Sequence, residues 1–261
     1  MRRVWKLALV LALGALCLSP SAWGEGTKHS PPTILPAPVS WQSSSAPTLC
    51  YSGCGGIYAP VVNAAYEQEL VELVNQERAA RGLPPLKRVA ALDEAARYHA
   101  TDMGEDDYDY PFHDTFDRVG GTLTFVCAWQ DRVLSYYTNT VSLAENLAAG
   151  FRTPRKALDA WMNSDGHRAN ILSTDYWEIG VGYYSGKGYY LNYWVQDFGK
   201  REGVYPLIIN GEAATTDSQK VSLYIYGEWN EVRLRNDDGP WTEWQPFQQT
   251  ITWTLPAQVG E

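Results

Sequence analysis

Glu178-Ile-Gly-Val-Gly-Tyr-Tyr-Ser-Gly-Lys-Gly-Tyr-Tyr-Leu-Asn-Tyr-Trp-Val-Gln-Asp-Phe198 is the most informative part of the sequence for the fold class. Its two ends, residues 178–184 and 189–198, alternate like β-strands, and the Ser-Gly-Lys-Gly between them favours a hairpin turn. The periodic segments upstream are helical, so helices precede a hairpin and do not alternate with strands. This order favours an α+β fold over a doubly wound α/β fold.

Four helices are expected upstream of the hairpin. Apolar residues at helical spacing begin at Ala65, and Gly82-Leu-Pro-Pro ends that helix. We expect a second helix from Val89 to Met103 and a short third helix from Ser142 to Ala149. A fourth runs from Pro154 to about Ser164, with proline in its first turn.

Downstream of the hairpin the sequence contains only strand-like runs: Tyr205–Ile209, Val221–Tyr226, Glu231–Arg235 and Ile251–Leu255. They predict a small all-β module over residues 200–261, of sandwich type. Its last strand should have a partner, yet the sequence stops soon after it. We therefore expect a module that is incomplete or completed in trans.

The N-terminal segment indicates export. Residues 1–24 combine a basic start, a short apolar run and small residues at Ala22 and Gly24, which is typical of a cleaved signal peptide. A retained anchor is the alternative. Residues 25–59 are rich in Pro, Ser and Thr and predict a linker. Since no other stretch is long and apolar enough to span a bilayer, we expect a secreted protein without a transmembrane segment.

The charge of the chain limits the molecules it can bind, and its cysteines limit the disulfides it can form. The net charge is −9, and removal of a signal peptide with three basic residues makes it more negative. Such a chain repels phosphate backbones, which argues against nucleic acid as a partner.

Three cysteines remain after cleavage: Cys50, Cys54 and Cys127. Either Cys50 pairs with Cys54, or one of the two pairs with Cys127, and one thiol is left over.

Two histidines and two glutamates are candidates for chemistry. His113 follows the acidic, aromatic loop that begins at Glu105, and His167 lies just past a helix end, where Gly166 can adopt positive φ. Glu145 lies on the expected third helix, and Glu178 begins a strand. Imidazole and carboxylate groups bind divalent metals or exchange protons near neutral pH. Spacing alone does not bring the four together, so separate surface or capping roles are the alternative.

Ordered motifs between residues 63 and 199 resemble one family. They are Leu73-Val-Asn-Gln-Glu-Arg, Leu92-Asp-Glu-Ala-Ala-Arg-Tyr-His, Ala144-Glu-Asn-Leu, Trp161-Met-Asn-Ser-Asp-Gly-His-Arg, Glu178-Ile-Gly-Val-Gly and Tyr193-Trp-Val-Gln-Asp-Phe-Gly. Together they resemble the bacterial branch of the CAP superfamily, the SCP-like relatives of pathogenesis-related protein 1. The resemblance implies an α-β-α sandwich over residues 60–199.

The resemblance also implies a site. In the family, groups matching His113, Glu145, His167 and Glu178 line one cleft, and the two histidines hold a divalent cation, often zinc. Asn75, Arg78 and His99 match family positions that we interpret as structural. Residues 114–141 form a longer insertion than is usual, expected near the cleft rim as a lid or an aromatic platform.

The C-terminal runs resemble a second family, the bacterial Ig-like module. The motifs are Tyr205-Pro-Leu-Ile-Ile-Asn-Gly, Val232-Arg-Leu-Arg-Asn-Asp-Asp-Gly-Pro-Trp and Trp253-Thr-Leu-Pro. In that family the chain normally continues into another strand.

These observations predict a secreted protein whose His/Glu cleft binds a divalent metal and a small or peptidic ligand. Two alternatives are a metal- or His-dependent hydrolase of peptides or esters, and a binder of lipid, cell-surface or cell-wall polymer without catalysis. Whether the protein is an enzyme stays open. Against hydrolysis, Ser142, Ser164 and Ser173 lie in no nucleophile-elbow motif.

Overall fold

A computed structural model describes residues Leu7–Ala12 and Ser52–Pro256. The chain forms, in order, β1 (Leu7–Ala12), α1 (Ala64–Ala79), β2 (Lys87–Arg88), α2 (Ala90–Glu105), β3 (Thr115–Val119), β4 (Thr122–Cys127), α3 (Trp129–Leu134), β5 (Thr140–Ala149), α4 (Pro154–Met162), α5 (Asp165–Leu172), β6 (Glu178–Ser185) and β7 (Asn192–Arg201). The remaining elements are β8 (Leu207–Ile209), the 3₁₀ turn η1 (Asn210–Glu212), β9 (Lys220–Ile225), β10 (Glu231–Asn236), β11 (Gln245–Pro246) and β12 (Thr250–Thr254).

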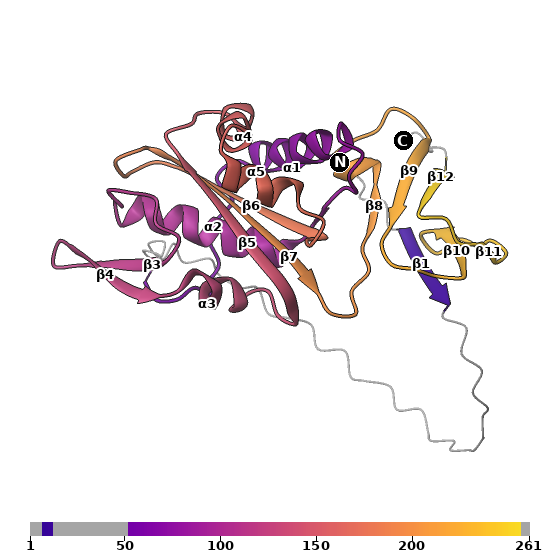
Figure 1. The fold of residues 1–261 in the computed structure, drawn as a ribbon, viewed down its shortest axis with the longest axis horizontal. Coiled ribbons are helices and arrows are strands. Elements are labelled where there is room, and N and C mark those ends of the chain that lie inside the picture. The colour runs from indigo at the N-terminus through magenta and orange to yellow at the C-terminus, as the bar shows by residue number, and fades with distance from the viewer. Residues whose placement is uncertain (1–6, 13–51, 257–261) are drawn as a thin grey trace, which may run out of the picture.

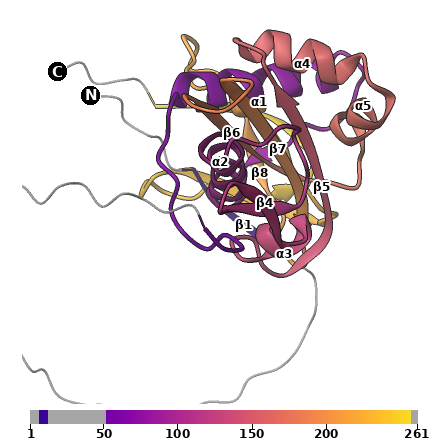
Figure 2. The same ribbon diagram turned by 90° about the vertical axis from the view of Figure 1, so that its left-hand side faces the viewer.

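A four-stranded sheet in the order β2-β6-β7-β5 forms the centre of the larger part. Helices α1, α4 and α5 cover one face, and α2 covers the other (Figures 1 and 2). The predicted hairpin is confirmed, because β6 pairs antiparallel with β7 from Glu178 opposite Gly199 to Ser185 opposite Asn192. The arrangement is the expected α-β-α sandwich.

Local sequence explains the helix starts. The Asn63 side chain accepts a hydrogen bond from the Tyr66 N–H (3.1 Å) and caps α1. Thr153 Oγ1 does the same for α4 by accepting from the Lys156 N–H (3.4 Å), and Pro154 takes the first helical position. These caps satisfy backbone donors that have no partner within the helix.

The two sides of the sheet have separate cores. One is built around Trp161, Trp194 and Phe198 between the sheet and α1, α4 and α5. On the other side α2 lies very close to β6, because a Cβ on Gly180 would lie 2.1 Å from the backbone carbon of Leu92. Glycine is therefore required there for α2 to approach the strand.

The expectation of a helix over residues 142–149 is wrong. These residues lie in β5, which pairs antiparallel with β7 from Thr140 to Ala149. Alanine, leucine and glutamate favour a helix locally, but an isolated eight-residue helix is marginal and intrinsic propensity is weak. Pairing with β7 and burial on both faces of the sheet decide the conformation. Glu145 is therefore a strand residue, directly opposite Asp197.

His167 lies past the end of α4, as expected, but the expected positive φ at Gly166 is wrong. Residues 165–172 form a further helix, α5, which begins directly after α4. Gly166 lies inside α5 and is not among the glycines with positive φ. His167 occupies the third position of the new helix, close to its N-cap residue Ser164.

The C-terminal part is all-β, as expected. Strands β12-β9-β8 form one sheet and β1-β10-β11 a second. Between them lies a core that includes Val221, Leu223, Val232 and Leu234. Strand β12 pairs with β9. Strand β1, which falls within the predicted signal peptide, pairs with β10, so cleavage after Gly24 would remove this strand from the mature protein.

The end of the predicted linker is attached to the sandwich. The Gly53 N–H donates to the Asp117 carboxylate (3.2 Å), and Cys54 forms a disulfide with Cys127 at the end of β4. The disulfide is one of the pairings left open by the sequence. Cys50 lies outside the described residues.

None of the helices within the described ranges combines the length and apolarity that a membrane crossing requires.

Candidate functional site

His113 and Glu145 form the centre of the site. The His113 Nδ1–H donates a hydrogen bond of 2.8 Å to Glu145 Oε1. The Glu145 side chain is completely buried, whereas 48% of the His113 side chain is exposed. Since Nδ1 faces the carboxylate, Nε2 is the ring nitrogen that is not used in this hydrogen bond.

Arg132 supports this pair from the protein interior. Its Nη1 donates to the His113 carbonyl (2.8 Å) and to Thr115 Oγ1 (2.9 Å), and its Nη2 pairs with Glu145 Oε2. Arg132 lies on α3, within the insertion 114–141, and is fully buried. One guanidinium thus fixes both the histidine backbone and the carboxylate that orients the histidine side chain.

A second carboxyl group lies opposite Glu145 on the neighbouring strand. Asp197 is fully buried, and neither of its carboxyl oxygens has a hydrogen-bond donor within the part of the chain that is described. Burial and the Glu145 charge raise the pKa of Asp197 well above its usual value. Burial alone would raise the pKa of Glu145 too, but the charge of Arg132 and the hydrogen bond from His113 lower it to about 2. Glu145 is therefore the ionised member of the pair, and Asp197 the protonated one.

His167 reaches the same region from α5. Its Nδ1 lies 2.9 Å from Ser164 Oγ, and its carbonyl accepts a hydrogen bond from the Asn146 amide. Burial and the nearby charge of His113 lower the pKa of His167. The structure thus brings three of the four predicted residues, His113, Glu145 and His167, into one neighbourhood, with neutral His167 favoured at pH 7.

Glu178 lies in a different set of contacts. Tyr137 Oη donates to Glu178 Oε2 (2.5 Å), and Arg201 donates to both carboxylate oxygens (2.9 and 2.6 Å). Strand β7 separates β6 from β5, so the backbones of Glu178 and Glu145 lie two strand spacings, about 10 Å, apart across the sheet and are offset by two residues along it. The hydrogen-bond partners of Glu178 are Tyr137 and Arg201, so Glu178 belongs to an ion pair separate from that of Glu145 and Arg132.

The residues interpreted as structural bind backbone groups. Asn75 both donates to and accepts from Leu86, at 3.0 and 2.7 Å. Arg78 donates to three carbonyls, among them that of Ile171 (2.8 Å). His99 is fully buried and donates through Nε2 to the Phe112 carbonyl (2.9 Å), and burial lowers its pKa to about 3.

His113 and His167 each carry an imidazole nitrogen that can bind a metal. Within the described residues, the groups of three or more His, Cys, Asp and Glu side chains close enough to share an ion do not include His113 or His167. An ion held by the two imidazoles would therefore retain open coordination positions.

A cavity of about 490 Å³ lies away from this site, between the sandwich and the C-terminal part. Aromatic residues dominate its lining, including Trp177, Tyr205, Tyr226 and Trp229. The ring of Trp177 stacks on Tyr226 with centroids 4.7 Å apart. None of the four predicted site residues lines it.

Comparison with known proteins identifies the sandwich. The cysteine-rich secretory protein family, CAP, matches residues 71–198. This part of the chain is a CAP domain.

Curated relatives come from Bacillus subtilis (strain 168). The chain is 36% identical over 141 residues to "Uncharacterized protein YkwD", covering 54% of this chain and 51% of that protein. It is 28% identical over 121 residues to "Uncharacterized membrane protein YlbC", covering 46% of this chain and 32% of that protein. The chain thus spans about half and about a third of the length of these relatives.

Solved structures are similar over about half of the chain. An extracellular protein containing a SCP domain from Bacillus anthracis is 27% identical, with a TM-score of 0.43, covering 52% of this chain and 40% of that one. An outer surface protein from Borrelia burgdorferi is 22% identical, also with a TM-score of 0.43, covering 55% of this chain and 99% of that one.

Proposed function

We propose that this CAP-domain protein is secreted and binds a divalent cation, zinc first of all, through Nε2 of His113 and Nε2 of His167. A small or peptidic ligand would take the coordination positions that the two imidazoles leave open. The signal-like N-terminus and the Cys54–Cys127 disulfide support export, because disulfides persist outside the cytosol.

The hydrogen bond from His113 to Glu145 carries the proposal. A histidine that ligates a metal usually donates its other ring N–H to a carboxylate or carbonyl, which fixes the tautomer and makes the free nitrogen a better ligand. His113 has this arrangement, and Glu145 is itself held by Arg132. His167 has its Nδ1 at Ser164, which leaves Nε2 for a ligand.

The charge states suit a metal. Zinc binds neutral imidazole, and the lowered pKa of His167 keeps this ring neutral at pH 7. The two nitrogens would supply the affinity, while the open positions would supply Lewis acidity toward a bound carbonyl or carboxylate.

Zinc titration of the mature protein tests the proposal. We expect one zinc per chain by isothermal titration calorimetry, lost in His113→Ala and in His167→Ala. Glu145→Gln should weaken binding by about 10- to 100-fold, because it removes the orienting carboxylate but neither ligand. His29→Ala, which removes a histidine remote in sequence, is the matched control. Zinc binding that survives both His113→Ala and His167→Ala would refute the proposal.

A further inference from the structure

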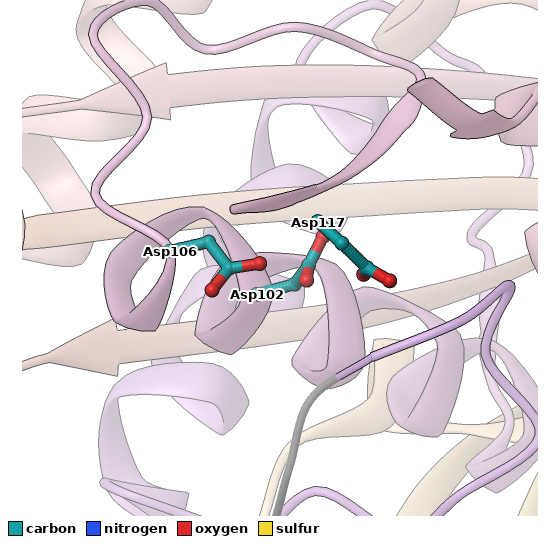
Figure 3. A group of neighbouring side chains, drawn as sticks. All are labelled: Asp102, Asp106 and Asp117. Carbon is teal, nitrogen blue, oxygen red and sulfur yellow. The ribbon is translucent and has the colours of Figure 1, made fainter. Parts of the chain in front are cut away.

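Three aspartates converge at the end of α2, apart from the histidines. Asp102 lies on the last turn of the helix, Asp106 directly follows it, and Asp117 reaches them from β3 (Figure 3). In this view the Asp102 carboxyl group lies between the other two. One carboxylate oxygen from each residue lies within 4.8 Å of the others.

Among the described residues, none of the three carboxyl groups forms an ion pair with lysine or arginine. His99 Nδ1 lies 3.8 Å from Asp102 Oδ2, but this imidazole is neutral at pH 7 because burial lowers its pKa to about 3. The Arg118 guanidinium lies nearby but donates to the backbone carbonyls of Asp106, Asp107 and Gly121. Acidic groups are therefore concentrated here. Burial, together with the neighbouring carboxylates, raises the pKa of Asp102.

The buried carboxyl group of Asp102 is not fully hydrogen-bonded by the described residues. Its side chain is 0% exposed. Oδ2 accepts a hydrogen bond from Tyr108 Oη (2.8 Å), but Oδ1 has no hydrogen-bond partner in the described part of the chain. A buried carboxylate oxygen without a donor is costly and calls for a proton, a water or a cation.

We propose that Asp102, Asp106 and Asp117 bind a calcium ion. The set contains oxygen ligands alone, which suits a hard cation and not zinc. Calcium–oxygen distances of about 2.3–2.6 Å place three evenly spaced oxygens at most about 4.0–4.5 Å apart, so the three carboxylates can share one ion after moving together by less than about 1 Å. Asp106 and Asp117 are partly exposed, which leaves room for water to complete the coordination.

Calcium at this position would join separate parts of the chain. It would tie the end of α2 to β3, and Asp117 already accepts the Gly53 N–H beside the Cys54–Cys127 disulfide. The ion would thus fasten the N-terminal entry of the CAP domain and the β3–β4 hairpin to the helix.

Calcium titration of the full chain, freed of metal with EDTA, tests the site. We expect calorimetry to detect one calcium ion per chain and the thermal midpoint to rise by several degrees in millimolar calcium chloride. Asp106→Asn and Asp117→Asn should each weaken calcium binding by about tenfold or more, because each removes one charged ligand. Both positions are partly exposed, so both variants should fold without calcium, as circular dichroism will show.

Two controls make the result specific. Asp109→Asn removes the same charge from an exposed position in the adjacent loop and should bind calcium like the unaltered protein. His113→Ala should also retain calcium, which separates this site from the proposed zinc site. The proposal is overturned if millimolar calcium neither binds nor shifts the midpoint, or if Asp109→Asn weakens binding as much as Asp117→Asn.

Discussion

Replacing Arg132 with methionine would remove the charge that holds Glu145 in the interior while keeping a side chain of similar length. The substitution deletes the donors to the His113 carbonyl (2.8 Å) and Thr115 Oγ1 (2.9 Å) and the ion pair with Glu145. Glu145 would then be a buried carboxylate that keeps its hydrogen bond from His113 but has lost the Arg132 charge. Its low pKa depends on Arg132, so the protein must either bury an uncompensated charge or protonate the group.

Breaking one side of a buried ion pair costs about 3–5 kcal/mol. We expect Arg132→Met to lower the free energy of unfolding at pH 7 by that amount. For a domain of this size the loss corresponds to a fall of about 6–20 °C in Tm. Methionine fills most of the vacated space, so the electrostatic loss should dominate over a cavity effect.

A double-mutant cycle separates the charge effect from a general packing defect. Urea unfolding followed by tryptophan fluorescence would be measured for Arg132→Met, Glu145→Gln and the double variant. Because Glu145→Gln removes the charge left unpaired, the double variant should be more stable than Arg132→Met by about 1 kcal/mol or more. A loss below about 1 kcal/mol in Arg132→Met, or strictly additive losses, would contradict the electrostatic explanation.

Three further predictions rest on other parts of the fold. Gly180→Ala should prevent stable folding, since its Cβ would lie 2.1 Å from the α2 backbone, whereas Gly166→Ala, which meets nothing within 4 Å, should be tolerated in thermal unfolding. Reduction of Cys54–Cys127, which are 73 residues apart, should lower stability by about 4 kcal/mol in urea unfolding with and without reductant, and equal midpoints would count against this. His99 stays neutral in the folded state because burial lowers its pKa to about 3, so only the unfolded chain takes up its proton below about pH 6.5. Its contribution to stability is therefore complete above that pH and falls by about 2 kcal/mol between about pH 8 and pH 5, a difference that should disappear in His99→Gln.

The pattern of apolar and turn residues within each segment of the sequence predicted much of the secondary structure. The hairpin of β6 and β7, helices α1, α2 and α4, and four of the five strands from β8 to β12 follow hydrophobic periods and turn residues that lie within each segment. The helix expected over 142–149 failed because its conformation depends on β7, which pairs with it from some fifty residues further along the chain.

The site was predicted in part. His113, Glu145 and His167 do lie in one neighbourhood, although Glu145 reaches it from a strand and His167 from inside a helix. Arg132 was missed, because an arginine in an insertion looks like a surface residue until folding buries it against Glu145.

The sequence alone predicted helices and strands where the hydrophobic pattern lies within one segment. It also supplied candidate cation-binding side chains, namely His113, Glu145, His167 and Glu178. Which side chains meet became clear only from the folded molecule: it joins His113 to Glu145, pairs Glu178 with Arg201, and gathers Asp102, Asp106 and Asp117, three residues that the sequence did not single out. The difference arises because periodicity reports on residues a few positions apart, whereas a binding site is set by contacts between elements that are distant along the chain until it folds.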